Sequence, residues 1–302
     1  EMRCSDGIFK QRSQNYLKFR NTARYCLGNL DGFDPDQMVS PEDMEELDRW
    51  AITRLNALIT RCFKAYDDYE FLVVTHAVND FCVVDMSNFY LDIIKDRLYC
   101  EEPDGRKRRS AQTALFLILD TMTKIMAPIL AYTCDEIWQS MAHRSSDDSR
   151  NVVFNDMNQP FTDYALPEDA MEKWALVEKL RDDVNAVLET ARAQKKIGKA
   201  LEAHVALHAA DDETAKVLMR VAGLNLAELF IVSECSISNA DPAADSVVGQ
   251  GTAFPGLTVE VREATGAKCE RCWMQSATVG DDADHPTLCA RCAAVVRNLP
   301  QF

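Results

Sequence analysis

Two short cysteine pairs near the end of the chain restrict its fold more than any other feature. Cys269 and Cys272 form one Cys-x-Arg-Cys turn, Cys289 and Cys292 form the other, and sixteen residues separate the turns. Two residues between paired cysteines let one tight turn present both sulfurs to one ion, and zinc takes four thiolates in a tetrahedron. We therefore expect one structural Zn²⁺ that folds a short tail and leaves no coordination position for catalysis.

The other cysteines are scattered singly through helical sequence, which is typical of reduced, buried thiols. They are Cys4, Cys26, Cys62, Cys82, Cys100, Cys134 and Cys235. Two disulfides among the clustered cysteines are the less favoured alternative. The first residues lack the pattern of a signal peptide, and no run approaches eighteen apolar residues, so we expect a cytoplasmic protein that contacts no membrane.

The formal net charge of -15 argues against a protein that binds nucleic acid by its bulk charge. Any contact with nucleic acid must therefore use local basic patches.

The first part of the chain is predicted to form a bundle of long helices over residues 1–145. Apolar residues recur at spacings of three and four in residues 9–30, 40–71, 71–99 and 110–141. Ser40 is expected to cap the second helix, with Pro41 as its first residue and Asp43 in the capping box. Pro128 should kink or divide the last helix.

The rest of the chain is expected to contain three smaller parts. A Ser- and Asp-rich connector and a long helix with a cationic end occupy residues 146–200. Alternating apolar residues in "LEAHVALHA", "LAELFIVSEC" and "GLTVEVREA" predict strands, with a short helix after the first, so residues 201–265 read as a small α+β unit. Residues 266–302 form the cysteine tail.

Several motifs resemble known families. "RNTARYCLGNL", "LDRW", "SNFYLDIIKDRLY" and "MAPILAYTCDEIW" resemble the anticodon-binding domain of class Ia aminoacyl-tRNA synthetases. "ARAQKKIGKALEAHV" and the segment from "KCERCW" to "LCARC" resemble the end of bacterial isoleucyl-tRNA synthetases that carry a zinc ribbon. The resemblance implies a mainly α fold, in which an anticodon-binding helix bundle precedes a small α+β junction unit and a Cys4 zinc ribbon.

The same resemblance implies a tRNA-binding fragment of a monomeric ligase. Neither the HIGH-like nor the KMSKS-like signature of the catalytic domain occurs in the sequence. ATP and Mg²⁺ would therefore belong to a missing catalytic domain, and this part, without catalytic residues, is expected to bind tRNA-Ile, not DNA, and to be inactive alone.

The expected tRNA contacts are basic and aromatic side chains in three places. Arg20 and Arg24 match "RNTxR", and Arg49 matches "DRW", whose Trp50 we expect in the core. The helix end and the tail contribute the remaining candidates, which are Lys195, Lys196, Lys199, Lys268, Arg271 and Trp273. An exposed Trp273 would stack on an unpaired base, although the ring could instead pack over the zinc turn.

Two other functions remain open at this stage. Formamidopyrimidine-type DNA glycosylases end in a similar zinc finger, but that likeness is confined to the tail. A zinc-stabilised protein-interaction module would suit the negative charge.

Overall fold

The computed structural model describes residues 5–299, without the side chains of residues 11 and 12. The chain forms two compact units, Glu1–Leu166 and Pro167–Phe302. Each unit buries a core of its own, as expected for a chain of this length.

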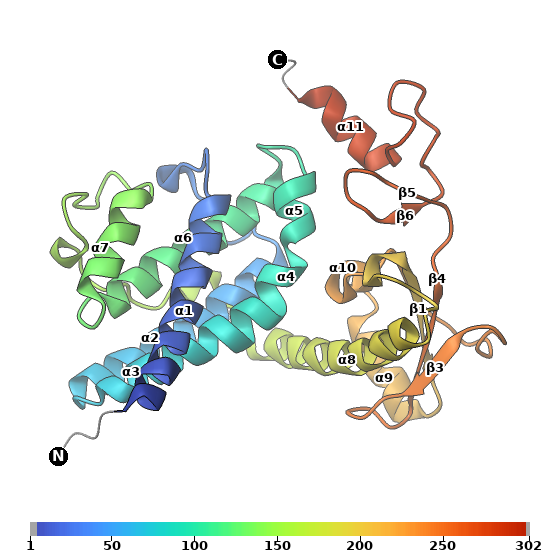
Figure 1. The fold of residues 1–302 in the computed structure, drawn as a ribbon, viewed down its shortest axis with the longest axis horizontal. Coiled ribbons are helices and arrows are strands. Elements are labelled where there is room, and N and C mark those ends of the chain that lie inside the picture. The colour runs from blue at the N-terminus through green and yellow to red at the C-terminus, as the bar shows by residue number, and fades with distance from the viewer. Residues whose placement is uncertain (1–4, 300–302) are drawn as a thin grey trace. The chain divides into compact units, whose positions relative to one another are not determined.

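Unit 1 is a bundle of helices (Figure 1). Its elements are α1 (Asp6–Asn29), η1 (Pro35–Gln37), α2 (Glu46–Asp67), α3 (Phe71–Asp80), the π-helix η2 (Phe81–Tyr90), α4 (Leu91–Ile93), α5 (Lys95–Cys100), α6 (Arg106–Met126), α7 (Ala131–Ser140), η3 (Val152–Phe154) and η4 (Thr162–Tyr164). The predicted division at Pro128 is confirmed, since α6 ends before it and α7 begins after it.

Helix α6 lies at the centre of unit 1. It contacts α1, α2, α5 and α7, and every residue from Ser110 to Met126 is buried. The buried carboxylates of Asp48 and Asp120 are paired with cations, as burial requires. The buried Asp48 carboxylate, for example, accepts hydrogen bonds from Tyr90, Arg97 and Ser110 at 2.5 to 3.2 Å.

The predicted start of the second helix is wrong. Ser40 and Asp43 bond each other across a separate turn, with the Asp43 N–H donating to the Ser40 carbonyl at 3.1 Å. Helix α2 begins at Glu46 instead, and the N–H of its N-cap, Glu45, donates to the Ser110 hydroxyl. A local turn therefore satisfies the groups that the capping box would have used.

Residues 145–166, expected as a connector, pack on the bundle. Asn56 donates to the Phe161 carbonyl and accepts from the Phe161 N–H, and the Leu166 N–H donates to Thr53. The connection therefore belongs to unit 1. The finer division of the chain at residues 145, 200 and 265 stays a prediction.

Unit 2 combines helices with two small sheets (Figure 1). Its elements are α8 (Glu168–Ala193), η5 (Ala200–Glu202), β1 (Ala203–Ala209), α9 (Asp212–Val221), α10 (Leu226–Phe230), β2 (Glu234–Ile237), β3 (Val247–Gln250), β4 (Leu257–Glu263), β5 (Ala267–Lys268), β6 (Gln275–Ser276) and α11 (Ala290–Asn298).

The larger sheet has the strand order β2-β1-β4-β3. Strand β1 pairs parallel to β2 and antiparallel to β4, and β3 is antiparallel to β4. Helices α8 and α9 contact this sheet. The predicted strand over "LAELFIVSEC" is mostly wrong, because Asn225 caps a short helix, α10, and only the last two residues of this segment belong to β2, which begins at Glu234.

Of the single cysteines, Cys235 is half-buried and Cys4 lies outside the described residues. The other five are buried as free thiols. Within residues 5–299, none of the helices combines the length and apolar character that crossing a bilayer requires.

Candidate metal centre and nucleic-acid interface

The four clustered cysteines meet at one point of the tail. Their sulfurs all lie within 4.8 Å of one another, and the Cys272 and Cys289 sulfurs are 3.9 Å apart. Four thiolates about 2.3 Å from a central zinc would place sulfurs about 3.8 Å apart. The donor set and its spacing therefore fit a tetrahedral zinc ion.

A tight hairpin presents the first cysteine pair. Strands β5 and β6 pair antiparallel, and the Cys269 N–H and the Met274 carbonyl close the turn between them at 2.9 Å. Gly266, just before β5, has a φ of 90°, and a Cβ there would lie 2.3 Å from the Ser276 backbone. Only glycine fits this position.

Hydrogen-bond donors surround the sulfurs. Arg271 donates to the Cys292 sulfur at 3.8 Å, and the Cys289 N–H donates to the Cys269 sulfur at 3.3 Å. Burial raises the pKa of the Cys269 thiol, but backbone N–H groups, from Cys272 first, outweigh burial and lower that pKa to about 6. These hydrogen bonds therefore favour the thiolate form of Cys269, the form that a metal ligand needs. Burial raises the pKa of the Cys272 and Cys292 thiols.

The tail has almost no core besides these thiols. Among residues 266–299, the buried side chains are the four cysteines together with Ala293 and Val295. Two small apolar side chains bury too little surface to hold more than thirty residues in place. A metal is therefore the only strong link that the described tail offers between its two halves.

Trp273 follows the second cysteine and is exposed. Its side chain is 56% exposed, whereas Trp50, Trp138 and Trp174 are 0 to 2% exposed. Its backbone has a left-handed φ of 66°. The ammonium groups of Lys199 and Lys268 lie 5.6 and 5.7 Å from its ring centroid. The structure thus brings together three of the predicted side chains, two from the tail and one from the helix end.

Two residues that the sequence reasoning missed hold this arrangement. The Glu202 carboxylate accepts hydrogen bonds from the Gly198 and Lys199 N–H groups, which lower its pKa. The Ser233 hydroxyl donates to the Leu201 carbonyl and accepts from the Gln275 N–H at 2.7 Å. Ser233 belongs to none of the family motifs. Glu202 lies within "ARAQKKIGKALEAHV" and, three residues after Lys199, fits a capping box, but it carries no positive charge that would suggest contact with tRNA.

The remaining lysines of the helix end lie beside this cluster in sequence. Lys195 and Lys196 are exposed, and the N–H of Lys196 donates to the Ala191 carbonyl as α8 ends. Lys195 has a left-handed φ of 58°, where glycine is usual. Buried Ile197 anchors the segment that follows.

The predicted residues of unit 1 have different surroundings. Arg20 and Arg24 are exposed on α1. Arg49 instead donates to the Tyr164 and Ala165 carbonyls at 3.2 and 2.7 Å, so its guanidinium holds the end of unit 1. Trp50 is buried against Phe89, as expected for a core residue, with ring centroids 4.7 Å apart.

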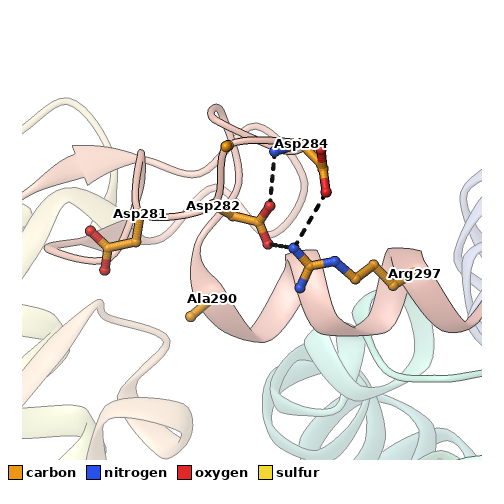
Figure 2. A pocket seen from close by; sticks show the side chains of 6 residues that line it. Asp281, Asp282, Asp284, Ala290 and Arg297 are labelled. Carbon is orange, nitrogen blue, oxygen red and sulfur yellow. Dashed lines mark hydrogen bonds and ion pairs between the residues drawn. The ribbon is translucent and has the colours of Figure 1, made fainter.

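The tail also has an acidic hollow of about 330 Å³. Figure 2 shows Asp282 and Asp284 directed at Arg297, whereas Asp281 points away from it. Three carboxylates and one guanidinium line this hollow, so it does not suit a phosphate. Within the described tail, the basic cluster at Trp273 is the surface that suits RNA.

Comparison with protein families identifies two regions of the chain. Residues 48–207, more than half of the chain, match the family described as the anticodon-binding domain of tRNA ligase. Residues 266–295 match the zinc finger found in FPG and IleRS. The zinc-finger match alone would be compatible with a DNA glycosylase as well as with a tRNA ligase. The match to the anticodon-binding domain favours the tRNA ligase.

Curated relatives are isoleucine–tRNA ligases. Those of Syntrophotalea carbinolica, Caldanaerobacter subterraneus and Geobacter sulfurreducens are 45, 42 and 42% identical to the chain, over 98, 97 and 98% of its length. The chain spans 31% of the length of each of them. By the extent of its family match, the chain belongs to the anticodon-binding domain family of tRNA ligases.

Proposed function

We propose that this chain recognises tRNA-Ile for an isoleucine–tRNA ligase. The observation that carries the proposal is the cluster of Lys199, Lys268 and Trp273, in which two ammonium groups lie within 6 Å of the ring centroid of an exposed indole. An aromatic face stacks on an unpaired base, and ammonium groups pair with the phosphates on either side of it.

The backbone strain at two of the proposed contacts supports this function. Trp273 and Lys195 are two of the four non-glycine residues with a positive φ among those described. A left-handed conformation costs such a residue roughly 1 to 2 kcal/mol. Since glycine would avoid this cost, we infer that the side chains are kept for binding and not for stability.

Recognition is proposed to combine positioning with base contacts. Arg20 and Arg24 in unit 1, with Lys195 and Lys196 in unit 2, contact phosphates, and Trp273 stacks on an anticodon base. Lys268 and Arg271 approach the same strand. Arg49 acts indirectly, because its guanidinium already bonds two carbonyls.

The tail is proposed to hold one structural Zn²⁺ through its four cysteines. When bound, the ion links the two halves of the tail, and no residue of this chain is catalytic. ATP and Mg²⁺ serve the ligase outside this chain. We further propose that the protein is a cytoplasmic monomer that does not bind DNA.

The test is the affinity of the 302-residue chain for a tRNA-Ile transcript at low salt, compared with the same transcript carrying a replaced anticodon. Preference for the native anticodon, reduced by Trp273→Ala in a zinc-loaded, folded protein, supports the proposal. Equal affinity for both transcripts refutes anticodon recognition by this chain, and absence of binding favours a protein-interaction module.

A further inference from the structure

Helix α1 has a face whose charges the fold does not use. The side chains of Lys10, Lys18, Arg20 and Arg24 make no ion pair or hydrogen bond with any residue described in the structure. Several cations elsewhere in unit 1 are paired, as with Arg54, whose guanidinium lies 2.8 Å from the Asp85 carboxylate. Arg61 and Lys107 are exposed and unpaired among the described residues, like the cations of α1, but they lie on other helices.

This helix is also free of acidic residues after its first position. No Asp or Glu occurs between Asp6 and Asp31, in a chain whose net charge is -15. Unpaired like charges repel one another, so such a face does not stabilise the bundle. It has the local basic character that an acidic protein needs to hold a polyanion.

The helical repeat aligns this face with solvent. Phe19, Ala23 and Cys26 point into the core. On the opposite side, Lys10, Leu17 and Arg24 follow at seven-residue intervals, so they lie along one line two turns apart. Arg20 and Lys18 lie on the two flanks of this line, Arg20 on the same side as Tyr16. Leu17 is 43% exposed on that line.

An exposed aromatic side chain is carried by a turn that bonds to α1. Tyr132, in the first turn of α7, is 95% exposed. Its neighbour Thr133 shares a hydrogen bond of 3.3 Å with the Tyr16 hydroxyl, which ties this turn to α1. Arg20 is one helical turn beyond Tyr16 on the flank that faces α7. The hydrogen bond therefore holds the turn that carries Tyr132 against α1.

We propose that the face of α1 and Tyr132 form a second RNA-contact surface, in unit 1. Lys10, Lys18, Arg20 and Arg24 pair with the phosphates of a stem, and the Tyr132 ring stacks on an unpaired nucleotide next to that stem. Charge complementarity selects RNA over an apolar protein partner. The inference rests on the proposed tRNA binding and adds residues that carry it.

The experiment compares matched pairs of variants for binding to the tRNA-Ile transcript across a range of salt concentrations. Lys10→Ala with Lys18→Ala is compared with Arg61→Ala and Lys107→Ala, two exposed cations on other helices. Each double variant removes two positive charges. We expect only the α1 pair to lower the slope of log K against log salt, by about 0.9 for each phosphate that the protein no longer neutralises.

Tyr132→Ala is compared with Tyr69→Ala, since Tyr69 is 80% exposed at another turn. We expect Tyr132→Ala to weaken binding of the transcript about tenfold, because one base no longer stacks, and to leave binding of a fully paired RNA duplex unchanged. Tyr132→Phe keeps the ring and should restore affinity.

Equal salt slopes for the two double variants, or equal affinities for the two tyrosine variants, overturn this inference. If Trp273→Ala weakens binding while these variants do not, the proposed function survives and the α1 surface falls. If the unchanged chain binds no tRNA, both fall.

Discussion

Removing zinc should unfold the tail and leave unit 1 intact. The tail buries only Ala293 and Val295 besides its four cysteines, among the residues described there. These two side chains contribute about 3 kcal/mol of hydrophobic free energy. Zinc binding by small zinc fingers contributes about 10 to 16 kcal/mol at neutral pH. The folding free energy of the tail therefore resides mainly in its metal bonds.

The spectroscopic change on chelation should be small. Helix α11 has nine of the 302 residues. Its unfolding would remove about 3% of the residues from the helical content that circular dichroism measures. Limited trypsin digestion followed by mass spectrometry is the sharper assay. We expect new, rapid cleavage after Arg271 and Arg291 in the chelated protein, at sites that the zinc-loaded tail protects.

A matched pair of variants tests whether the metal ligands are responsible. Cys272→Ser should reproduce the effect of chelation without chelator, whereas Cys235→Ser, at a half-buried thiol outside the cluster, should not. Equal protection of the tail with and without zinc would refute the reasoning, because the tail would then have another source of stability.

Three further predictions concern unit 2. Trp273→Gly should keep the zinc-loaded tail folded, because glycine adopts the left-handed φ of this position without steric cost, and thermal melting measures this effect. The same variant should weaken tRNA binding as Trp273→Ala does, and a binding titration measures that effect. Asp183→Asn should destabilise unit 2 by about 3 kcal/mol in urea unfolding, because this buried carboxylate accepts the N–H groups of residues 252–254 at 2.7 to 3.1 Å. Burial raises the pKa of Glu260, but the Ala243 N–H and His208 outweigh it and hold this pKa below 4.5. Its contribution to stability is therefore complete above about pH 4.5 and is lost as the pH falls through the lower folded-state pKa, so Glu260→Gln should flatten the acid limb of the curve of melting temperature against pH.

The sequence was sufficient for features that depend on local spacing. Paired cysteines two residues apart meet in one turn, and apolar residues three and four apart form one helix face, so the cluster at Cys269 and the buried faces of α2 and α6 were predictable. Both rules concern neighbours in the chain and need no knowledge of tertiary contacts.

Features that depend on distant partners were not predictable. The start of α2 depends on Ser110, a residue sixty-five positions away from Glu45 that receives its N–H. The position of Trp273 depends on Ser233, which joins three segments through one hydroxyl. Nothing near either residue in the sequence signals these contacts.

The complete burial of residues 110–126 of α6 has a consequence for biosynthesis. The inner faces of α1 and α2 pack on a helix that the ribosome makes later, and this part of α6 has no exposed side to keep it in solution alone. At about 5 to 20 residues per second, roughly sixty residues take about 3 to 12 seconds. This is the interval between the synthesis of the end of α2 and the synthesis of the end of α6, and during it the apolar faces of the nascent bundle have no partner. A chaperone would therefore be needed most during this interval.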